Sequence, residues 1–293
     1  MKARNFFHAV VLSGLVGATA ASAAPFFFNN GDVDGRMASA SRPSTASDFE
    51  IESGDDFILT GRTRITSASF IGLLPSSASL SDIGLLRVEI YRVFPKDSDV
   101  GRTSGPPTFS TDRVPTRVNS PSDVAFDERD TAGSSLSFAA TVLASSFTAA
   151  NSVQPGGIHP KPGQTTGGDG PVTGQEVRID VTFATPFDLP ADHYFFVPQV
   201  EVGGPGDFLW LSSVRPIVAP GTPFSPDLQA WARDEFLAPD WLRIGTDIVG
   251  GSPAPTFNLA FSLQGQTIPE PSSLALLGLV GVLSLTATRR HRS

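Results

Sequence analysis

The sequence contains no cysteine among its 293 residues. This absence excludes a disulfide scaffold, a thiolate zinc site, an iron–sulfur cluster and a cysteine nucleophile. Positive charge is also scarce, because 21 Lys and Arg stand against 29 Asp and Glu, which argues against a nucleic-acid partner. What the chain does have is 28 Gly and 25 Pro with 40% hydrophobic residues, a composition that favours short strands and turns around a core.

Residues 1–23 have the three parts of an export signal. Lys2 and Arg4 form the positive start, and a largely apolar stretch follows. Ala21-Ser22-Ala23 then has the small-x-small form that signal peptidase accepts, so we expect cleavage between Ala23 and Ala24. The alternative is an anchor helix that is retained, although the stretch is short of the roughly 20 apolar residues that usually span a bilayer.

The other end of the chain has a different three-part pattern. Pro269-Glu270-Pro271 comes first, residues 272–288 are apolar and uncharged, and a basic cluster closes the chain. The sequence predicts a transmembrane helix over 272–288, with the basic cluster held in the cytoplasm. A plain C-terminal anchor and a buried core helix are the alternatives, but a core helix would show a polar stripe. The basic residues are Arg289, Arg290 and Arg292.

This C-terminal pattern resembles the PEP-CTERM sorting signal, with the match covering 267–293. The resemblance implies recognition by exosortase, an integral-membrane enzyme that cuts near Pro-Glu-Pro, and a transient anchor in the inner membrane. It also implies export to the outside or the outer surface of a Gram-negative-type bacterium and association with extracellular polysaccharide. Signal peptidase would be the second processing partner.

The body, which we place at residues 24–266, is more acidic than the whole chain, because the two end segments are basic. It keeps 16 basic and 28 acidic residues, a net charge of −12. Such a body repels anionic polymers unless cations bridge them.

The sequence of the body predicts an all-β fold, namely an antiparallel β-sandwich of the jelly-roll type. Alternating apolar residues recur through it, most regularly in 86–94 and 176–183, and about eight or nine strands follow from this pattern. Residues 227–237 favour one short helix. Two polar tracts, 95–134 and 151–175, look like long loops between strands.

The body also resembles, more loosely, the β-sandwich domains of other PEP-CTERM exports. The residues that carry this likeness are Asn29 to Gly35, Ser41-Arg42-Pro43, Glu52 to Phe57 and Leu189 to Phe196. This likeness supports the predicted fold and the predicted export of the protein, and it identifies no catalytic residue in this chain.

A calcium site is the one cofactor that the residues suggest. Asn and Asp residues cluster in the turn at 29–35, and a pair of acids follows further along; such oxygen-rich loops bind Ca²⁺. The alternative is an ordinary turn, because Asn, Asp and Gly are turn formers. The candidate ligands are Asn29, Asp32, Asp34, Asp55 and Asp56.

No catalytic constellation stands out. His159 lies in a Gly- and Pro-rich tract, and His193 has no Gly-x-Ser-x-Gly motif to accompany it. We therefore expect a non-enzymatic exported protein that is structural or associated with a biofilm matrix. A carbohydrate-binding module is the alternative, and a hydrolase acting on polysaccharide is a third. The aromatic residues available for stacking on sugar rings are Trp210, Trp231, Trp241 and Tyr194.

Overall fold

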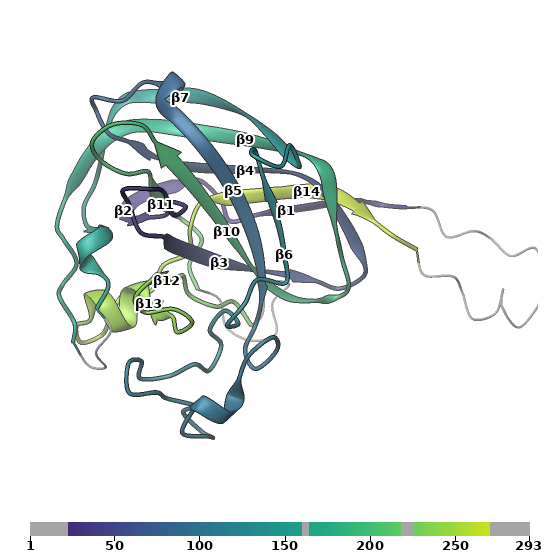
Figure 1. Cartoon of the computed structure of the whole chain (residues 1–293), viewed down its shortest axis with the longest axis vertical. Coiled ribbons are helices and arrows are strands. Elements are labelled where there is room, and N and C mark those ends of the chain that lie inside the picture. The colour runs from purple at the N-terminus through teal and green to yellow at the C-terminus, as the bar shows by residue number, and fades with distance from the viewer. Residues whose placement is uncertain (1–22, 160–163, 218–225, 270–293) are drawn as a thin grey trace, which may run out of the picture. The chain divides into compact units, whose positions relative to one another are not determined.

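The computed structural model describes residues 23–159, 164–217 and 226–269. Residues 24–268 form one compact unit. This unit consists of β-strands in two sheets (Figure 1). Nearly all pairings are antiparallel, so the predicted all-β sandwich is confirmed.

The larger sheet is built around β4 (Thr63–Leu74). One edge of β4 pairs with β9 along its whole length, and the other edge pairs first with β14 and then with β11. The remaining strands extend the sheet on both sides. They are β1 (Pro25–Asn29), β2 (Val33–Ala40), β7 (Leu136–Ala149), β8 (Ser152–Val153), β9 (Val172–Leu189), β11 (Leu209–Ser213) and β14 (Phe261–Thr267).

The smaller sheet has the order β13-β12-β3-β10-β5-β6. Its strands are β3 (Ile51–Leu59), β5 (Ile83–Arg92), β6 (Asp127–Asp130), β10 (Asp192–Val202), β12 (Trp231–Asp234) and β13 (Leu242–Arg243). Short helical turns connect some strands, namely η1 (Leu80–Asp82), η2 (Val100–Arg102), η3 (Pro155–Gly157) and the π-type η4 (Ile244–Val249).

The main core lies between the sheets. Aromatic rings from both sides meet there: Phe196 of β10 stacks on Phe261 of β14 with ring centroids 5.0 Å apart, and Trp210 of β11 contacts both. The predicted inward faces of the two most regular strands are buried, because every second residue of an extended chain points to the same side.

A second apolar cluster covers the outer face of the smaller sheet. It contains Tyr91, Phe195, Val197, Leu228, Trp231 and Trp241. Tyr91 lies on the face of β5 opposite Val88 and Ile90, and it is 3% exposed because the other members of this cluster pack over it. Strand β3 is consequently buried on both of its faces.

Residues 227–237 do not form the predicted helix. Residues 231–234 are strand β12, which pairs with β3 from Trp231 opposite Gly54 to Asp234 opposite Ile51. The open edge of β3 offers a complete ladder of hydrogen-bond partners, which outweighs the helical spacing of the apolar residues.

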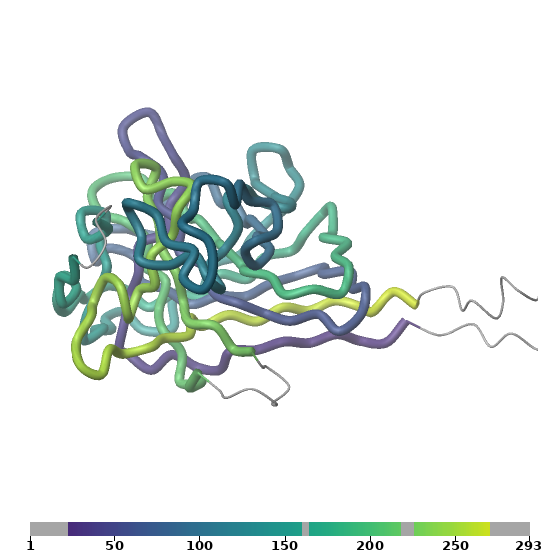
Figure 2. The backbone as a smooth tube through the Cα atoms, turned by 90° about the horizontal axis from the view of Figure 1, so that it is seen from below, coloured from purple at the N-terminus to yellow at the C-terminus, as the bar shows by residue number. Residues whose placement is uncertain are grey.

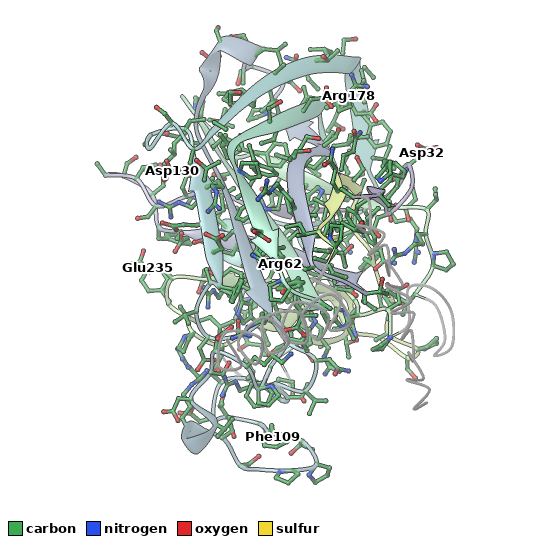
Figure 3. All side chains as sticks on the ribbon, turned by 90° about the vertical axis from the view of Figure 1, so that its right-hand side faces the viewer. Asp32, Arg62, Phe109, Asp130, Arg178 and Glu235 are labelled. Carbon is green, nitrogen blue, oxygen red and sulfur yellow. The ribbon has the colours of Figure 1, made fainter. Side chains whose placement is uncertain are left out.

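The first polar tract is packed rather than loose. Residues 95–126 extend below the smaller sheet as turns, and residues 127–130 become β6 (Figure 1). Arg117 in this segment is 1% exposed, pairs with Asp123 and lies 4.4 Å over the Phe94 ring. Phe109 marks the segment in Figure 3.

The second tract, 151–175, also contains regular structure. Strand β8 and the turn η3 occupy its first half, and β9 begins at Val172. No helix in the described ranges has the length and apolar character to cross a bilayer. The predicted span 272–288 lies outside those ranges.

Candidate functional sites

The two ends of the sandwich are hydrogen-bonded to each other. Strand β1 pairs antiparallel with β14, from Pro25 opposite Gln266 to Asn29 opposite Ser262. Beyond the strands, Thr267 N–H donates to the Ala24 carbonyl at 2.8 Å, and Ala24 N–H donates to Thr267 Oγ1 at 3.0 Å. Figure 2 shows the two strands leaving the body side by side. Ala24, the first residue expected after signal cleavage, therefore lies beside Thr267, which precedes the Pro-Glu-Pro segment by two positions.

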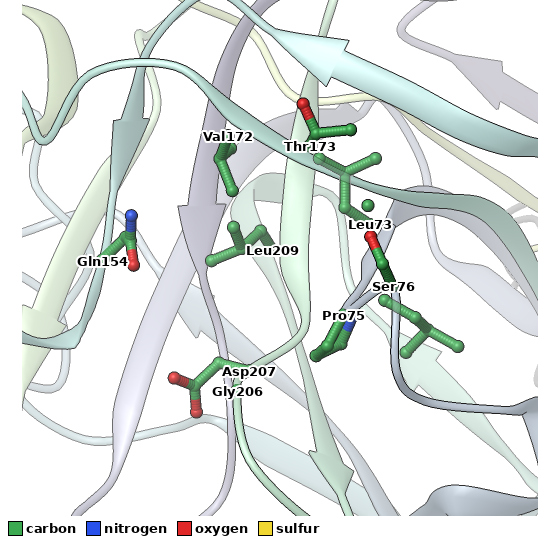
Figure 4. Close-up of a pocket in the computed structure, with 11 residues that line it drawn as sticks. Leu73, Pro75, Ser76, Gln154, Val172, Thr173, Gly206, Asp207 and Leu209 are labelled. Carbon is green, nitrogen blue, oxygen red and sulfur yellow. The ribbon is translucent and has the colours of Figure 1, made fainter.

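Two cavities, each of about 240 Å³, lie at the far end of β4. Thr63 begins β4 opposite Thr267, whereas Leu73 and Leu74 end it at the first cavity (Figure 4). At about 3.3 Å per residue, the length of β4 separates this cavity from the paired ends by roughly 35 Å. Gly206 and Asp207 line both cavities.

The second cavity is the more polar one. Arg42 Nη1 lies 2.5 Å from Asp207 Oδ1 and 3.4 Å from Asp48 Oδ1, so its charge is shared between two carboxylates. Glu201 also lines the cavity, where it accepts a hydrogen bond from Leu85 N–H at 2.8 Å. The second cavity therefore combines one guanidinium with three carboxyl groups.

Most of the predicted processing residues lie outside the described ranges. This applies to Ala21, Glu270 and Pro271, and to Arg289, Arg290 and Arg292. Ala23, Ala24 and Pro269 are inside, and Ala24 takes part in the pairing of the two ends.

The five predicted calcium ligands are not brought together. Asn29 Oδ1 accepts from Gly31 N–H at 2.8 Å, and Asp34 Oδ1 accepts from Arg36 N–H at 2.9 Å, so both side chains stabilise the turn. Asp32 is exposed at the side of the molecule (Figure 3). Throughout the described ranges, no three His, Asp or Glu side chains are grouped to hold a metal ion.

Asp55 and Asp56 are instead fully buried and face opposite sides of β3. Asp55 points into the sandwich, where its Oδ2 accepts from Leu259 N–H at 2.7 Å. Asp56 points outward, and its Oδ1 accepts from Leu228 N–H at 3.0 Å. Burial raises the pKa of both carboxyls well above the usual range; Asp56 adds to the effect on Asp55, and Asp227 to the effect on Asp56.

His193 contacts this cluster through Asp56. Its Nε2 lies 2.6 Å from Asp56 Oδ2, and the side chain is 16% exposed. Burial lowers the pKa of His193 to about 4, so the imidazole is neutral near pH 7. This contact between His193 and Asp56 joins β10 to β3.

A second buried network lies on the outer face of the same strand. Tyr91 O–H donates to Glu52 Oε1 at 2.6 Å, Arg233 Nη2 donates to the Tyr91 oxygen at 2.8 Å, and Arg233 also pairs with Glu52. The Arg233 guanidinium lies 4.3 Å from the centre of the Trp241 ring. Burial and the neighbouring Glu52 and Glu50 raise the pKa of Glu89 to about 9.

Sequence reasoning missed this network because its members are far apart in the chain. Glu52, Glu89, Tyr91 and Arg233 come from three strands, and no local spacing joins them. The one local signal was the polar run Glu52 to Asp56 in a segment bounded by strand-forming residues. Such a run predicts a strand whose two faces both meet polar partners.

The aromatic residues proposed for sugar stacking belong to the interior. Trp210, Trp231, Trp241 and Tyr194 are each at most 1% exposed. Their polar atoms are also engaged in part: Trp210 Nε1 donates to the Ala260 carbonyl at 2.9 Å and Trp241 Nε1 to the Ser122 carbonyl at 3.1 Å. The stacking assignment is corrected, because a sugar ring needs an open aromatic face.

Comparison with known proteins identifies one segment of the chain. The family model for the PEP-CTERM protein-sorting motif matches residues 267–292, which confirms the resemblance found at the C-terminal end. No curated protein and no solved structure matches the chain. The motif indicates an exported protein that exosortase sorts, and it begins at Thr267, where β14 ends.

Proposed function

We propose that the chain is an exported, jelly-roll-like β-sandwich protein with a non-enzymatic role in an extracellular matrix. Signal peptidase releases it at Ala24, exosortase cuts it near Pro269-Glu270-Pro271, and the product acts at the surface or outside of a Gram-negative-type bacterium. The observation that carries the proposal is the sorting-motif match at residues 267–292.

The pairing of β1 with β14 supports this processing scheme. Ala24 and Thr267 are held together by hydrogen bonds, so both proposed cuts fall next to one end of the folded sandwich. Cleavage at these points leaves every strand in place, because β1 begins at Pro25 and β14 ends at Thr267.

The non-enzymatic role is supported by the state of the buried acids. The carboxyls with strongly raised pKa values, Asp55, Asp56 and Glu89, are at most 7% exposed. None of them lines either of the two cavities. A catalytic acid must reach its substrate, and these groups hold strands together instead. A hydrolase would need a different pair of acids.

Mass spectrometry of the protein from culture medium and envelope fractions tests the processing. We expect a product that begins at Ala24 and ends within or next to residues 269–271. Replacing all three residues of Pro269-Glu270-Pro271 by Ala should leave a full C-terminal tail in the membrane fraction. As the matched control, Glu235→Ala alters an exposed acid of the body and should be processed normally. An intact arginine tail on the unaltered protein would overturn the proposal.

Carbohydrate binding at the cavity end is a second candidate. Its support is the pair of adjoining cavities, where polar groups such as Gln154 and Thr173 lie beside the apolar Leu73 and Leu209. Glycan-array binding that falls at least tenfold in Gln154→Ala, and is unchanged in Glu235→Ala, would favour it. Equal binding by both variants, or none by the unaltered protein, would leave the structural role as the better account.

A further inference from the structure

Strand β7 is a long edge strand of the larger sheet. Among the described strands it pairs with β9 alone, from Leu136 opposite Phe183 to Ala149 opposite Val172. Outside that pairing, no main-chain hydrogen bond joins residues 136–148 to another described residue. The main-chain N–H and C=O groups along the second edge of β7 are therefore open to a further strand.

The composition of β7 does not protect this edge. The strand has 14 residues, and none of them is charged or a proline. The other edge strands are protected by charge, by short length or by a proline. All residues of β6 are charged, β8 and β13 have 2 residues each, and β1 has 5 residues and begins with Pro25. A long, uncharged edge favours the addition of another strand.

The open and regular part of β7 is its first half. At the far end, Ala150 N–H donates to the Gly35 carbonyl at 2.8 Å, so β2 lies beside the end of β7. The register with β9 shifts after Val142, whereas residues 136–142 pair without interruption. The outward side chains of this stretch are exposed, and they are small: Ser137, Ala139 and Thr141.

The sequence of this stretch is symmetric in character about Ala139. If two identical strands pair antiparallel and are centred on Ala139, each residue lies opposite the one at equal distance on the other side of Ala139. Residues paired in this way are alike: apolar with apolar, hydroxyl with hydroxyl, and aliphatic with aliphatic. The pairs are Phe138 with Ala140, Ser137 with Thr141, and Leu136 with Val142. A two-fold symmetric contact needs such self-complementarity.

Electrostatic repulsion is weak along this edge, although the body carries a net charge of −12. The charged residues of β9 beside the stretch are Asp180, opposite Ala139, and Arg178, opposite Thr141, and they pair with each other at 2.9 Å. In two self-paired sheets, the two β9 strands would be three strand spacings apart, or about 14 Å. That separation exceeds the Debye length of about 8 Å at physiological salt.

We propose that residues 136–142 bind the same residues of a second copy of the chain, antiparallel and centred on Ala139. The pairing joins the larger sheets of two sandwiches into one continuous sheet. This association does not depend on processing at the two ends of the chain. A single strand pair is a small interface, so the dimer should dissociate on dilution.

A cysteine cross-link tests the register directly, because the unaltered chain contains no cysteine. Ala139→Cys would place the Cβ atoms of the two copies about 4.5–5.5 Å apart, close to the distance in a disulfide. We expect oxidation of the purified full-length variant to give a covalent dimer on non-reducing electrophoresis. Thr182→Cys is the matched control, since Thr182 is exposed but lies on β9, one strand in from the edge. It should cross-link at least tenfold less. Equal cross-linking by both variants, or none by Ala139→Cys, would overturn the proposal.

Sedimentation of the full-length chain over a range of concentrations tests the association itself. We expect a dimer whose dissociation constant rises at least tenfold in Ala139→Lys, because two lysines would face each other across the strand pair. Within one chain the introduced lysine lies beside Asp180, so the variant should keep its Tm. Thr182→Lys should dimerise as the unaltered chain does.

Two results of the sedimentation experiment would contradict the proposal. The first is association that persists unchanged in Ala139→Lys, as association through the apolar segment 272–288 would. The second is an unaltered chain that stays monomeric at every concentration, which would leave the edge of β7 to a strand from a different protein.

Discussion

At the scale of single residues, the most consequential feature is Arg233 beneath the outer cluster. It donates to Glu52 and Tyr91, and its guanidinium stacks on Trp241. Its side chain is 7% exposed, so water cannot replace these contacts. The positive charge of Arg233 stabilises the two neighbouring buried acids, Glu52 and Glu89, in the folded state.

Replacing this cation should therefore destabilise the fold. We expect Arg233→Met to lower the free energy of unfolding by about 3–5 kcal/mol, the usual cost of leaving a buried ionic partner unpaired. Arg178→Met is the matched control, because Arg178 and its partner Asp180 are 44% and 45% exposed (Figure 3). Its effect should stay within about 1 kcal/mol. Urea unfolding of both variants measures the difference, and equal losses would contradict the assigned role.

The titration of Glu89 should make the folded protein less stable as pH rises, whereas ordinary acid denaturation makes a protein less stable as pH falls. Its pKa is raised from 4.5 to about 9, so between these values the folded chain keeps a proton that the unfolded chain releases. The free energy of unfolding then falls as pH rises through this window. His193, lowered from 6.5 to about 4, acts in the other direction below pH 6.5. Stability should therefore decline from pH 6.5 to pH 9.

Urea unfolding at several pH values in this range tests the decline. Glu89→Gln should reduce the slope by up to about 1.4 kcal/mol per pH unit, the free energy that corresponds to one proton. Glu128→Gln serves as control, since Glu128 lies opposite Glu89 on the neighbouring strand but is exposed. A slope that both variants leave unchanged would show that Glu89 is ionised in the folded protein.

These residues also show how far sequence reasoning reaches. The alternation in 176–183 predicted a strand with one apolar face, and Val177, Ile179 and Val181 of that face are at most 1% exposed, because alternation in a strand is a local property. The partners of Asp55 and Glu52 depend on which distant segments cover β3, and no spacing within the chain encodes that. The sequence could therefore predict the strands and leave the buried networks unrecognised.

At the scale of elements, the pairing of strand β14 depends on Gly265, which has no side chain. A Cβ atom at Gly265 would lie 2.0 Å from the Arg64 carbonyl oxygen of β4, where the register of the two strands shifts. This close approach lets β14 pair with β1 on one side and β4 on the other. The strand that leads into the sorting motif is thus sensitive to a single methyl group.

We expect Gly265→Ala to lower the free energy of unfolding by about 1–3 kcal/mol, a typical cost of overpacking. Gly61→Ala is the matched control, because no atom lies within 4 Å of the Cβ it would add. Gly61→Ala should change the free energy of unfolding by no more than about 1 kcal/mol, and it should raise this free energy if the backbone at residue 61 accepts an alanine without strain. Thermal melts of the two variants provide the comparison, and a Gly265→Ala protein as stable as Gly61→Ala would mean that β14 can move away from β4.

The predicted helix at 227–237 illustrates the same dependence on neighbouring elements. Leu228, Trp231 and Phe236 have helical spacing, yet Trp231 pairs opposite Gly54 in the smaller sheet. Residues 231–234 form a strand because an edge of the smaller sheet was available, and that edge is formed by residues far away in the chain. Local sequence patterns predict secondary structure reliably where one face of an element is buried, and they fail where both faces are buried.

At the scale of the whole sandwich, its two ends and its cavities lie at opposite extremes of β4. The hydrogen-bonded pair Ala24 and Thr267 is at one extreme, and Gly206 lines the cavities at the other. Figure 1 shows β1 and β14 running toward one side, whereas the connection from β10 to β11 lies at the other. The proposed cut near Pro269 follows Thr267, which is hydrogen-bonded to Ala24, so bulk placed next to Ala24 should obstruct that cut.

This geometry yields a test of the whole arrangement. A small folded domain inserted directly before Pro25 should slow removal of the C-terminal tail, because it would stand beside the segment that exosortase must reach. The same domain inserted between Gly204 and Pro205, in an exposed turn beside the second cavity, should leave the rate unchanged. Pulse labelling followed by mass spectrometry of the tail measures both rates. Equal slowing by the two insertions would indicate a general effect of size, and no slowing by the first would mean that the pairing of β1 with β14 opens before the enzyme acts.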